Sequence, residues 1–269
     1  MLRLLSAAVL APILWASVKL APPGVFCGLL FVAVGIGCWE MYRLLGACGA
    51  RAFSWLGIPA SWAVLWSFTQ VEPRYDATAP IAAVTIAAAV LAMWRRESPR
   101  EMLDTALKTV FPVLFVGLAL GHMIGLRRVP GEEGTDLLIL LFICVMFADT
   151  AAFYGGTALG RRRMAPRISP KKSWEGAAFG MAGSVGGALL GHLWFYQQLS
   201  LTHTLILGLI LGFAAILGDL AQSMVKRAAD AKDCSNLIPG HGGLLDRADS
   251  LIFSAPILYY YFHAILQGG

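Results

Sequence analysis

Long apolar runs recur along the whole chain, separated by short polar segments. Leu205–Leu217 and Leu251–Leu266 are two of the clearest examples. A bilayer core about 30 Å thick requires roughly 20 mostly apolar residues per helix. Within lipid, only helices and closed barrels satisfy the backbone polar groups, and the strict alternation of barrel strands is absent here. The pattern therefore predicts an all-α polytopic integral membrane protein.

The apolar runs predict nine transmembrane helices. Their approximate bounds are roughly 4–18, 24–42, 53–70, 77–94, 110–126, 137–159, 175–196, 203–225 and 250–266. The first run lacks a convincing cleavage site and further spans follow it, so we expect a helix there and not a removed signal peptide. The charged segment Glu97–Thr109 fits a short amphipathic helix along the membrane interface, and it fits a plain solvated loop equally well.

The chain shows no internal repeat and no low-complexity linker. We therefore expect a single transmembrane domain over residues 1–269. Residues 1–109 would hold the N-terminal helices and the interfacial segment, and residues 110–269 would hold the helices that carry the chemistry.

Composition agrees with a membrane protein, since 58% of the residues are hydrophobic and only 14% are charged. Ordinary soluble domains carry roughly 25% charged residues. The net charge of +5 does not indicate nucleic acid, because in a membrane protein the distribution of charge matters more than its total. The cysteines Cys27, Cys38, Cys48, Cys144 and Cys234 show no metal-binding spacing.

The positive charges predict the orientation. With the N-terminus in the cytoplasm, nine spans place most of the 21 Lys and Arg residues on the inner side. Only Lys19, Arg74, Arg127 and Arg128 fall on the other side. We therefore expect a cytoplasmic N-terminus and a C-terminus on the opposite side.

Two acids that lie inside apolar runs draw attention, because a carboxylate costs about 2.5–3.5 kcal/mol at the centre of a membrane helix. They are Asp149, in FICVMFADTAAFYGG, and Asp219, which precedes Lys226. At 1.5 Å per residue, Asp219 lies about 10 Å inside the basic boundary, and Asp219, Ser223 and Lys226 share one helix face. Each acid fits either a polar cavity or a structural contact between helices, and Asp149 would either orient a basic residue or line a cavity for the lipid headgroup.

The loop that follows combines glycines, cations and acids. Gly240, Gly242 and Gly243 suit a nest of N–H groups around phosphate. The cations able to neutralise phosphate are Lys226, Arg227, Lys232 and Arg247. Asp246 and Asp249, together with Asp219, supply the hard oxygen ligands that Mg²⁺ takes alongside substrate phosphates. A mixed-charge loop that only anchors topology is the alternative interpretation.

This segment resembles the signature of the phosphatidate cytidylyltransferase (CDP-diglyceride synthase) family. The resemblance runs from Ser223 to Asp249, with Ala248 as a departure where a larger aliphatic residue or Thr is expected. Upstream it includes Asp149–Gly155, Ile168–Gly176 and Gly218–Leu220, so it covers most of the C-terminal half. The first hundred residues resemble the family only in being apolar helical spans.

The resemblance implies transfer of a cytidylyl group from CTP to phosphatidic acid, forming CDP-diacylglycerol and pyrophosphate. It further implies Mg²⁺, alone or with a second cation, a homodimer, and an active site facing the cytoplasm of the bacterial inner membrane. We assign Asp219, Asp246 and Asp249 to the metal and count them, with Lys226, as the catalytic residues.

The remaining predicted site residues hold phosphates or support those that do. Those for CTP or phosphate are Ser169, Lys171, Ser173, Ser223, Arg227, Lys232, His241, Gly242, Gly243 and Arg247, and the supporting ones are Asp149, Glu175 and Asp233. A lipid phosphate with a second pKa near 6 needs little help from a general base. His241 is therefore expected to contact phosphate or pyrophosphate, or else to brace the glycine turn.

Three other functions are compatible with parts of the pattern. Another CTP-using lipid enzyme would act on an isoprenoid or ether lipid, or would phosphorylate a polyprenol. A transporter or channel would line an ion path with Asp149 and Asp219, but its acids should be spread across the bilayer depth. A scaffold would have no use for the cluster of Asp, Lys and Gly.

Overall fold

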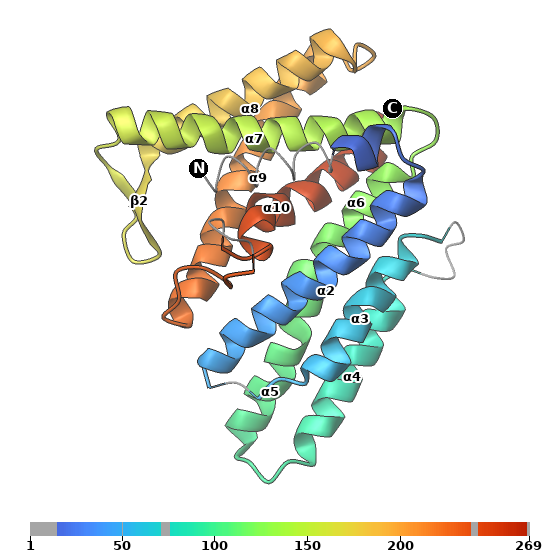
Figure 1. Ribbon diagram of the computed structural model, residues 1–269, viewed down its shortest axis with the longest axis vertical. Coiled ribbons are helices and arrows are strands. Elements are labelled where there is room, and N and C mark those ends of the chain that lie inside the picture. The colour runs from blue at the N-terminus through green and yellow to red at the C-terminus, as the bar shows by residue number, and fades with distance from the viewer. Residues whose placement is uncertain (1–14, 50, 71–75, 238–241, 268–269) are drawn as a thin grey trace. The chain divides into compact units, whose positions relative to one another are not determined.

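The computed structural model describes residues 15–49, 51–70, 76–237 and 242–267, and most of them are helical (Figure 1). They form two compact units. The first unit comprises the described residues of Met1–Gly125 together with Val225–Arg247, and the second comprises Leu126–Met224 with the described residues of Ala248–Gly269. Each span predicted after the first corresponds to a helix, whereas the predicted span 4–18 lies largely outside the described residues.

The first unit is a group of packed helices. They are α2 (Pro23–Ala47), α3 (Ser54–Ser67), α4 (Thr78–Met93), α5 (Pro99–Pro112), the π-helical η2 (Val113–Leu118) and α6 (Ala119–Arg127), whose last two residues belong to the second unit. Val64, Val84 and Val113, from three different helices, form a buried apolar cluster. The hydroxyl of Tyr42 also donates to the carbonyl of Thr109 at 2.6 Å, which ties α2 to α5.

The segment Glu97–Thr109 lies at the start of a long helix. Ser98 and Glu101 form a capping box, and Pro99 occupies the first turn, where its missing N–H costs nothing. From there α5, η2 and α6 follow one another without a break over Pro99–Arg127. Of the two interpretations left open for this segment, the solvated loop is therefore wrong and a helix is present, whereas its position along the membrane interface stays a prediction. Residues 109 and 110, where the expected division lies, are both part of α5.

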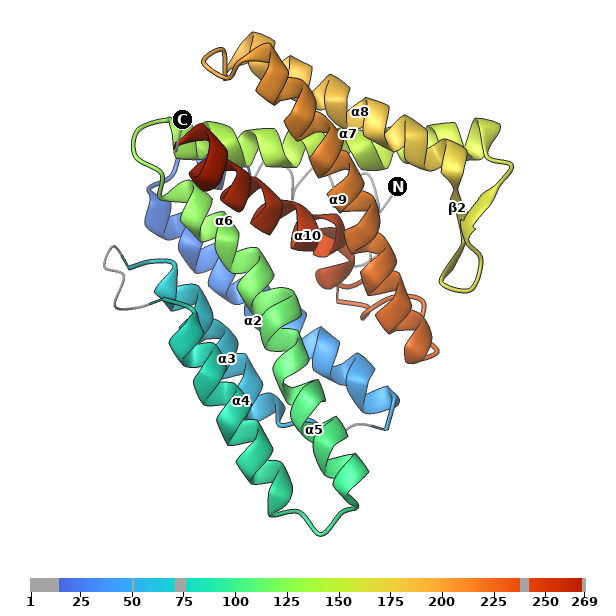
Figure 2. The ribbon, with the colours of Figure 1, turned by 180° about the vertical axis from the view of Figure 1, so that it is seen from behind.

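The second unit is built on α7 (Glu133–Leu159) and α8 (Trp174–Trp194), which lie side by side in both views (Figure 1, Figure 2). Small residues permit this close approach. A Cβ atom added at Gly176, Gly180, Gly183 or Gly187 of α8 would lie 2.6–3.2 Å from a backbone oxygen of α7. The helix backbones are therefore in contact along this seam of glycines.

A short antiparallel hairpin connects α7 to α8. Its strands are β1 (Arg163–Ala165) and β2 (Ser169–Ser173), paired with Arg163 opposite Ser173 and Ala165 opposite Ser169. The side chain of Ser173 accepts a hydrogen bond from the N–H of Gly176 at 3.1 Å and so caps α8. The hairpin is a departure from the expected all-helical chain.

Like α6, two further helices contain residues of both units. They are α9 (Leu201–Ala228) and α10 (Leu245–Tyr261), the latter continued by the π-helical η3 (Phe262–Leu266). After the C-terminus of α9, the N–H of Ala231 bonds to the carbonyl of Lys226 and that of Asp230 bonds to the carbonyl of Arg227. Asp230 has φ +50°, so it occupies the left-handed position of a Schellman motif.

In the described parts of the chain, four helices are long and apolar enough to cross a membrane. They are Pro23–Ala47, Pro99–Arg127, Glu133–Leu159 and Leu201–Ala228. Many large apolar side chains point outward, among them Leu29 and Val32 of α2 and Leu209 and Phe213 of α9, as expected for helices that face lipid. These features support an all-α integral membrane protein, whereas the number of nine spans and the orientation stay predictions.

Candidate functional site

The second unit contains a cavity of about 700 Å³ that joins charged and apolar side chains. It is lined by Ala148, Asp149, Ala152, Phe153, Gly156, Thr157, Gly160, Arg163, Met164, Lys171, Lys172, Ser173, Gly176, Ala177, Ile216 and Asp219. These residues come from α7, the hairpin, α8 and α9. Three cations and two carboxylates thus face the same space as Phe153, Ala152 and Ile216, which suits an amphiphilic anion.

Asp219 is held by two groups of the same unit. Its Oδ2 accepts from Lys172 Nζ at 2.6 Å, and its Oδ1 accepts from Ser223 Oγ at 3.3 Å. The side chains of Lys172 and Asp219 remain 23% and 30% exposed, so the ion pair is open to the cavity. The contact between Asp219 and Ser223 confirms that these two side chains share a helix face. Lys172 was not among the predicted site residues, although it directly follows Lys171 in a motif that the sequence had singled out.

Asp149 and Asp249 are connected to the same part of the fold through α10. Ser250 Oγ donates to both carboxylate oxygens of Asp149, at 3.1 and 3.3 Å, which ties α10 to α7. Asp249 accepts from the N–H of Ser250 at 2.8 Å. Its carbonyl lies so close to Gly218 that a Cβ atom there would be 2.5 Å away, so the backbones of α9 and α10 meet beside Asp219. Of the two roles left open for Asp149, lining a cavity agrees with its position.

The predicted residues around the hairpin divide between the cavity and local structure. Lys171 and Ser173 line the cavity, and Ser173 is also the buried cap of α8. Ser169 is half-buried at the start of β2 and is not part of the lining. Glu175 accepts hydrogen bonds from the N–H groups of Arg161 and Arg162, which fixes the turn that follows α7.

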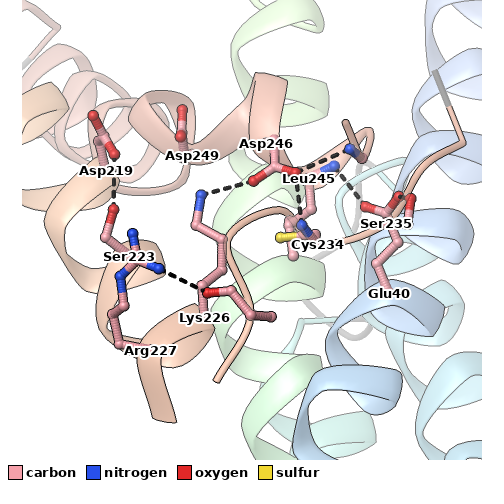
Figure 3. A network of polar contacts seen from close by, with 12 residues as sticks. Glu40, Asp219, Ser223, Lys226, Arg227, Cys234, Ser235, Leu245, Asp246 and Asp249 are labelled. Atoms are coloured by element: carbon pink, nitrogen blue, oxygen red, sulfur yellow. Dashed lines mark hydrogen bonds and ion pairs between the residues drawn. The ribbon is translucent and has the colours of Figure 1, made fainter. Parts of the chain in front are cut away.

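The first unit contains a second group of predicted residues, centred on Asp246 (Figure 3). Asp246 Oδ1 accepts from Lys226 Nζ at 2.7 Å, and Oδ2 accepts from the N–H groups of Cys234 and Gly243 at 2.7 and 2.9 Å. Burial alone would raise the pKa of Asp246. The ammonium of Lys226 and the two N–H groups outweigh that effect, so its pKa lies below the usual value.

A residue that the sequence analysis did not single out belongs to this group. Glu40 of α2 is fully buried, and its carboxylate accepts from Ser235 Oγ and from the N–H groups of Leu244 and Leu245. A signal existed: Glu40 is an acid inside an apolar run, the same observation that drew attention to Asp149 and Asp219.

The other predicted residues of this loop are mostly exposed. Arg227 donates to the carbonyl of Ala231 at 3.1 Å, and Lys232, Asp233 and Arg247 are exposed. Gly242 has φ +79°, a conformation that favours glycine. His241 and Gly240 lie outside the described residues. The phosphate-binding roles of this set stay predictions.

Across the described residues, no group of three or more His, Cys, Asp or Glu side chains could hold a metal ion. Beside a nucleotide, however, Mg²⁺ generally takes only one or two protein carboxylates together with substrate phosphates and water. Asp219 and Asp249 fit that requirement, because they are partly exposed carboxylates on neighbouring helices. Asp246 fits it less well, since its two oxygens already accept three hydrogen bonds.

Comparison with known proteins identifies the family to which the chain belongs. The model of the cytidylyltransferase family matches residues 1–265. A phosphatidate cytidylyltransferase of Pseudomonas aeruginosa is 34% identical over 258 residues, which are 95% of this chain and 94% of that protein. Its counterpart in Brucella suis is 32% identical over 247 residues, covering 88% of this chain and 84% of that protein. One from Synechocystis is 46% identical over 141 residues, 51% of this chain and 47% of that protein.

Proposed function

Because the chain belongs to the cytidylyltransferase family, we propose that it transfers the cytidylyl group of CTP to phosphatidic acid, forming CDP-diacylglycerol and pyrophosphate. The similarity to the Pseudomonas relative over 95% of this chain carries the proposal. The cavity supports it, since it offers cations for phosphate and apolar side chains for the lipid.

In the proposed reaction, a phosphate oxygen of phosphatidic acid attacks the α-phosphorus of CTP. The bond from that phosphorus to the oxygen bridging the α- and β-phosphates breaks, and pyrophosphate leaves with the electron pair. Both substrates are anions, so neutralisation and positioning supply most of the acceleration.

The cavity residues have separate roles in this scheme. Arg163, Lys171 and Lys172 neutralise phosphate oxygens. Asp219 orients the ammonium of Lys172 through their 2.6 Å contact and keeps it in the cavity before substrate binds. Asp149 accepts from Ser250 and so fixes α10 against α7.

The loop in the first unit has the second role, that of holding the triphosphate. Arg227, Lys232 and Arg247 are exposed and carry positive charge, which suits them to phosphate oxygens. Lys226 is engaged by Asp246 and orders the loop. The phosphate contacts assigned to His241 and Gly242 form part of the same proposal.

We assign Mg²⁺ to Asp219 and Asp249, with Asp246 as a further candidate. When bound, the ion would offset the negative charge of the triphosphate and polarise the α-phosphate. The requirement is tested by titrating Mg²⁺ against a chelator while product is measured, with Asp249→Asn as the variant. If the wild-type protein forms product at the same rate in excess chelator, Mg²⁺ is not required and this assignment is wrong.

The location also remains a proposal: nine spans in the bacterial inner membrane, with the site facing the cytoplasm, where CTP is present, and the protein acting as a homodimer. The positive charges that follow α7 and α9 support this orientation.

The function is tested with purified protein in detergent and labelled CTP. Pyrophosphate and a labelled lipid should form only when phosphatidic acid is added. Isoprenoid phosphate, polyprenol and an ether lipid serve as competing substrates in parallel reactions. Preferred use of any of them, or hydrolysis of CTP without lipid, would contradict the assignment.

A further inference from the structure

The first turn of α10 is held by a carboxylate from a distant part of the chain. Glu40 Oε1 accepts from the N–H of Leu244 at 3.0 Å, and Oε2 accepts from the N–H of Leu245 at 2.7 Å. These N–H groups lie at the helix N-terminus, where the backbone has unsatisfied donors and negative charge is favourable. Glu40 therefore caps α10 in the way that a local Asp or Ser usually does.

The same carboxylate also binds the other end of the loop. Glu40 Oε1 accepts from Ser235 Oγ at 2.5 Å, and the N–H of Leu237 in turn donates to that hydroxyl oxygen at 3.1 Å. Glu40 and Asp246 thus act in parallel. Each joins the segment around Cys234 and Ser235 to the segment from Gly243 to Leu245.

The side chain of Glu40 is closely surrounded by the rest of the first unit. The side chain is 0% exposed. A Cβ atom at position 243 would lie 2.7–2.9 Å from its carboxylate, so the contact requires glycine there. The packing against Glu40 therefore explains why position 243 is a glycine. The N–H of Gly243 donates to Asp246.

We propose that Glu40 is a positioning residue of the cytidylyl transfer. Its carboxylate fixes the first turn of α10, and with it the orientation of Asp246 and Arg247, which that turn carries. The proposal rests on the function proposed above. It also gives the N-terminal half a defined role at the site, although its sequence carries none of the signature motifs.

The first test is the Glu40→Gln variant of the full-length protein. The carboxylate of Glu40 accepts hydrogen bonds from three donors, namely Ser235 Oγ and the N–H groups of Leu244 and Leu245. The amide of glutamine has one oxygen and one NH₂ group, so at least one of these donors loses its acceptor, and the negative charge is lost as well. A hydrogen bond to a charged group contributes about 1.5–3 kcal/mol, which corresponds to a fall in kcat of roughly 10- to 100-fold. KM for CTP should rise by a smaller factor, because Arg247 lies in the turn that loosens, whereas Arg227 and Lys232 lie outside it.

Matched variants separate positioning from general damage. Ser235→Ala removes one of the three hydrogen bonds and keeps the charge, so kcat should fall by a smaller factor. Glu97→Gln also neutralises a glutamate of the first unit, one that pairs with Arg51 and Arg95 away from α10, and should leave kcat unchanged.

A second measurement does not depend on activity. Cys234 is 4% exposed and its N–H is held by Asp246, so its thiol should react slowly with N-ethylmaleimide. The other cysteines, Cys27, Cys38, Cys48 and Cys144, are replaced by alanine or serine in this background. Glu40→Gln should speed the alkylation of Cys234 at least roughly tenfold, whereas Glu97→Gln should not.

Each outcome decides the proposal. A fall in kcat together with faster alkylation supports it. Unchanged kcat refutes it whatever the thiol does, and a fall in kcat with unchanged alkylation shows that Glu40 acts in another way. If Glu40→Gln fails to fold, Ser235→Ala carries the same comparison. If the wild type makes no product, the proposed function fails, and alkylation alone still decides whether Glu40 fixes the first turn of α10.

Discussion

Replacing Lys226 by methionine should expose how strongly the loop depends on one buried ion pair. Lys226 Nζ lies 2.7 Å from Asp246 Oδ1, and the two side chains are only 12% and 4% exposed. Methionine is unbranched and adaptable, so it fills much of the same space without the charge. The variant leaves a buried carboxylate with only its two backbone N–H donors.

The loss of stability expected for Lys226→Met depends on the hydrogen bonds that Asp246 keeps. Removing one partner of a buried pair costs about 3–5 kcal/mol, and the two N–H groups that remain place this case near 3 kcal/mol. For a protein of this size, such a loss corresponds to a fall in Tm of roughly 6–12 °C. The double variant Lys226→Met with Asp246→Asn should recover most of it, because no unpaired charge stays buried.

The assay is thermal unfolding of the purified protein in detergent at pH 7. Lys232→Met is the matched control, since it removes an exposed lysine from the same loop. Its Tm should stay within about 1 °C of the wild-type value. If Lys226→Met unfolds at the temperature of the wild type, the ion pair does not hold the loop, and the reasoning is refuted.

Three further predictions concern pH, the cavity and the helix packing. The folded state holds the pKa of Asp246 below its ordinary 3.8, so the stability that Asp246 contributes should be complete above pH 3.8 and should be lost as pH falls through the lowered pKa. In a plot of Tm against pH, Asp246→Asn should therefore reduce the fall of Tm at acid pH. Asp219→Asn should lower kcat/KM by roughly 10- to 100-fold in the labelled-CTP assay, because Lys172 loses a charged partner. If this variant is as active as the wild type, the ion pair of Lys172 and Asp219 has no role in the mechanism. Gly183→Ala should lower Tm, because its Cβ would lie 2.6 Å from the backbone oxygen of Phe147. Gly186→Ala is the control and should leave Tm unchanged, because a Cβ there meets nothing within 4 Å. Equal Tm values for the two variants would contradict the close packing of α7 and α8.

Local spacing made part of the site predictable from sequence. Asp219 and Ser223 are four residues apart, and a helix necessarily places them on one face, where they are in contact. The apolar runs likewise located the helices, since lipid-facing and core-facing positions are both apolar. The hairpin was missed because its strands are short and rich in charged residues, which is also typical of a loop.

The partners of the key side chains were not predictable in the same way. Lys172 contacts a residue 47 positions later in the chain, and Glu40 binds N–H groups more than 200 positions later. Such pairs are created by tertiary packing, and nothing in local periodicity specifies them. Glu40 was recognisable only as an acid in an apolar helix, which signals importance without naming a partner.

The glycines of α8 also determine how the cavity can respond to a ligand. Where two backbones touch, there are few side chains between them whose rotamers can change, so α7 and α8 must move as one piece. The wall that they form has a fixed width. Any widening needed to admit a bulky headgroup must therefore come from α9 or from the hairpin. If the hairpin moves, its Lys171 and Lys172 would carry their charge toward or away from the bound phosphate.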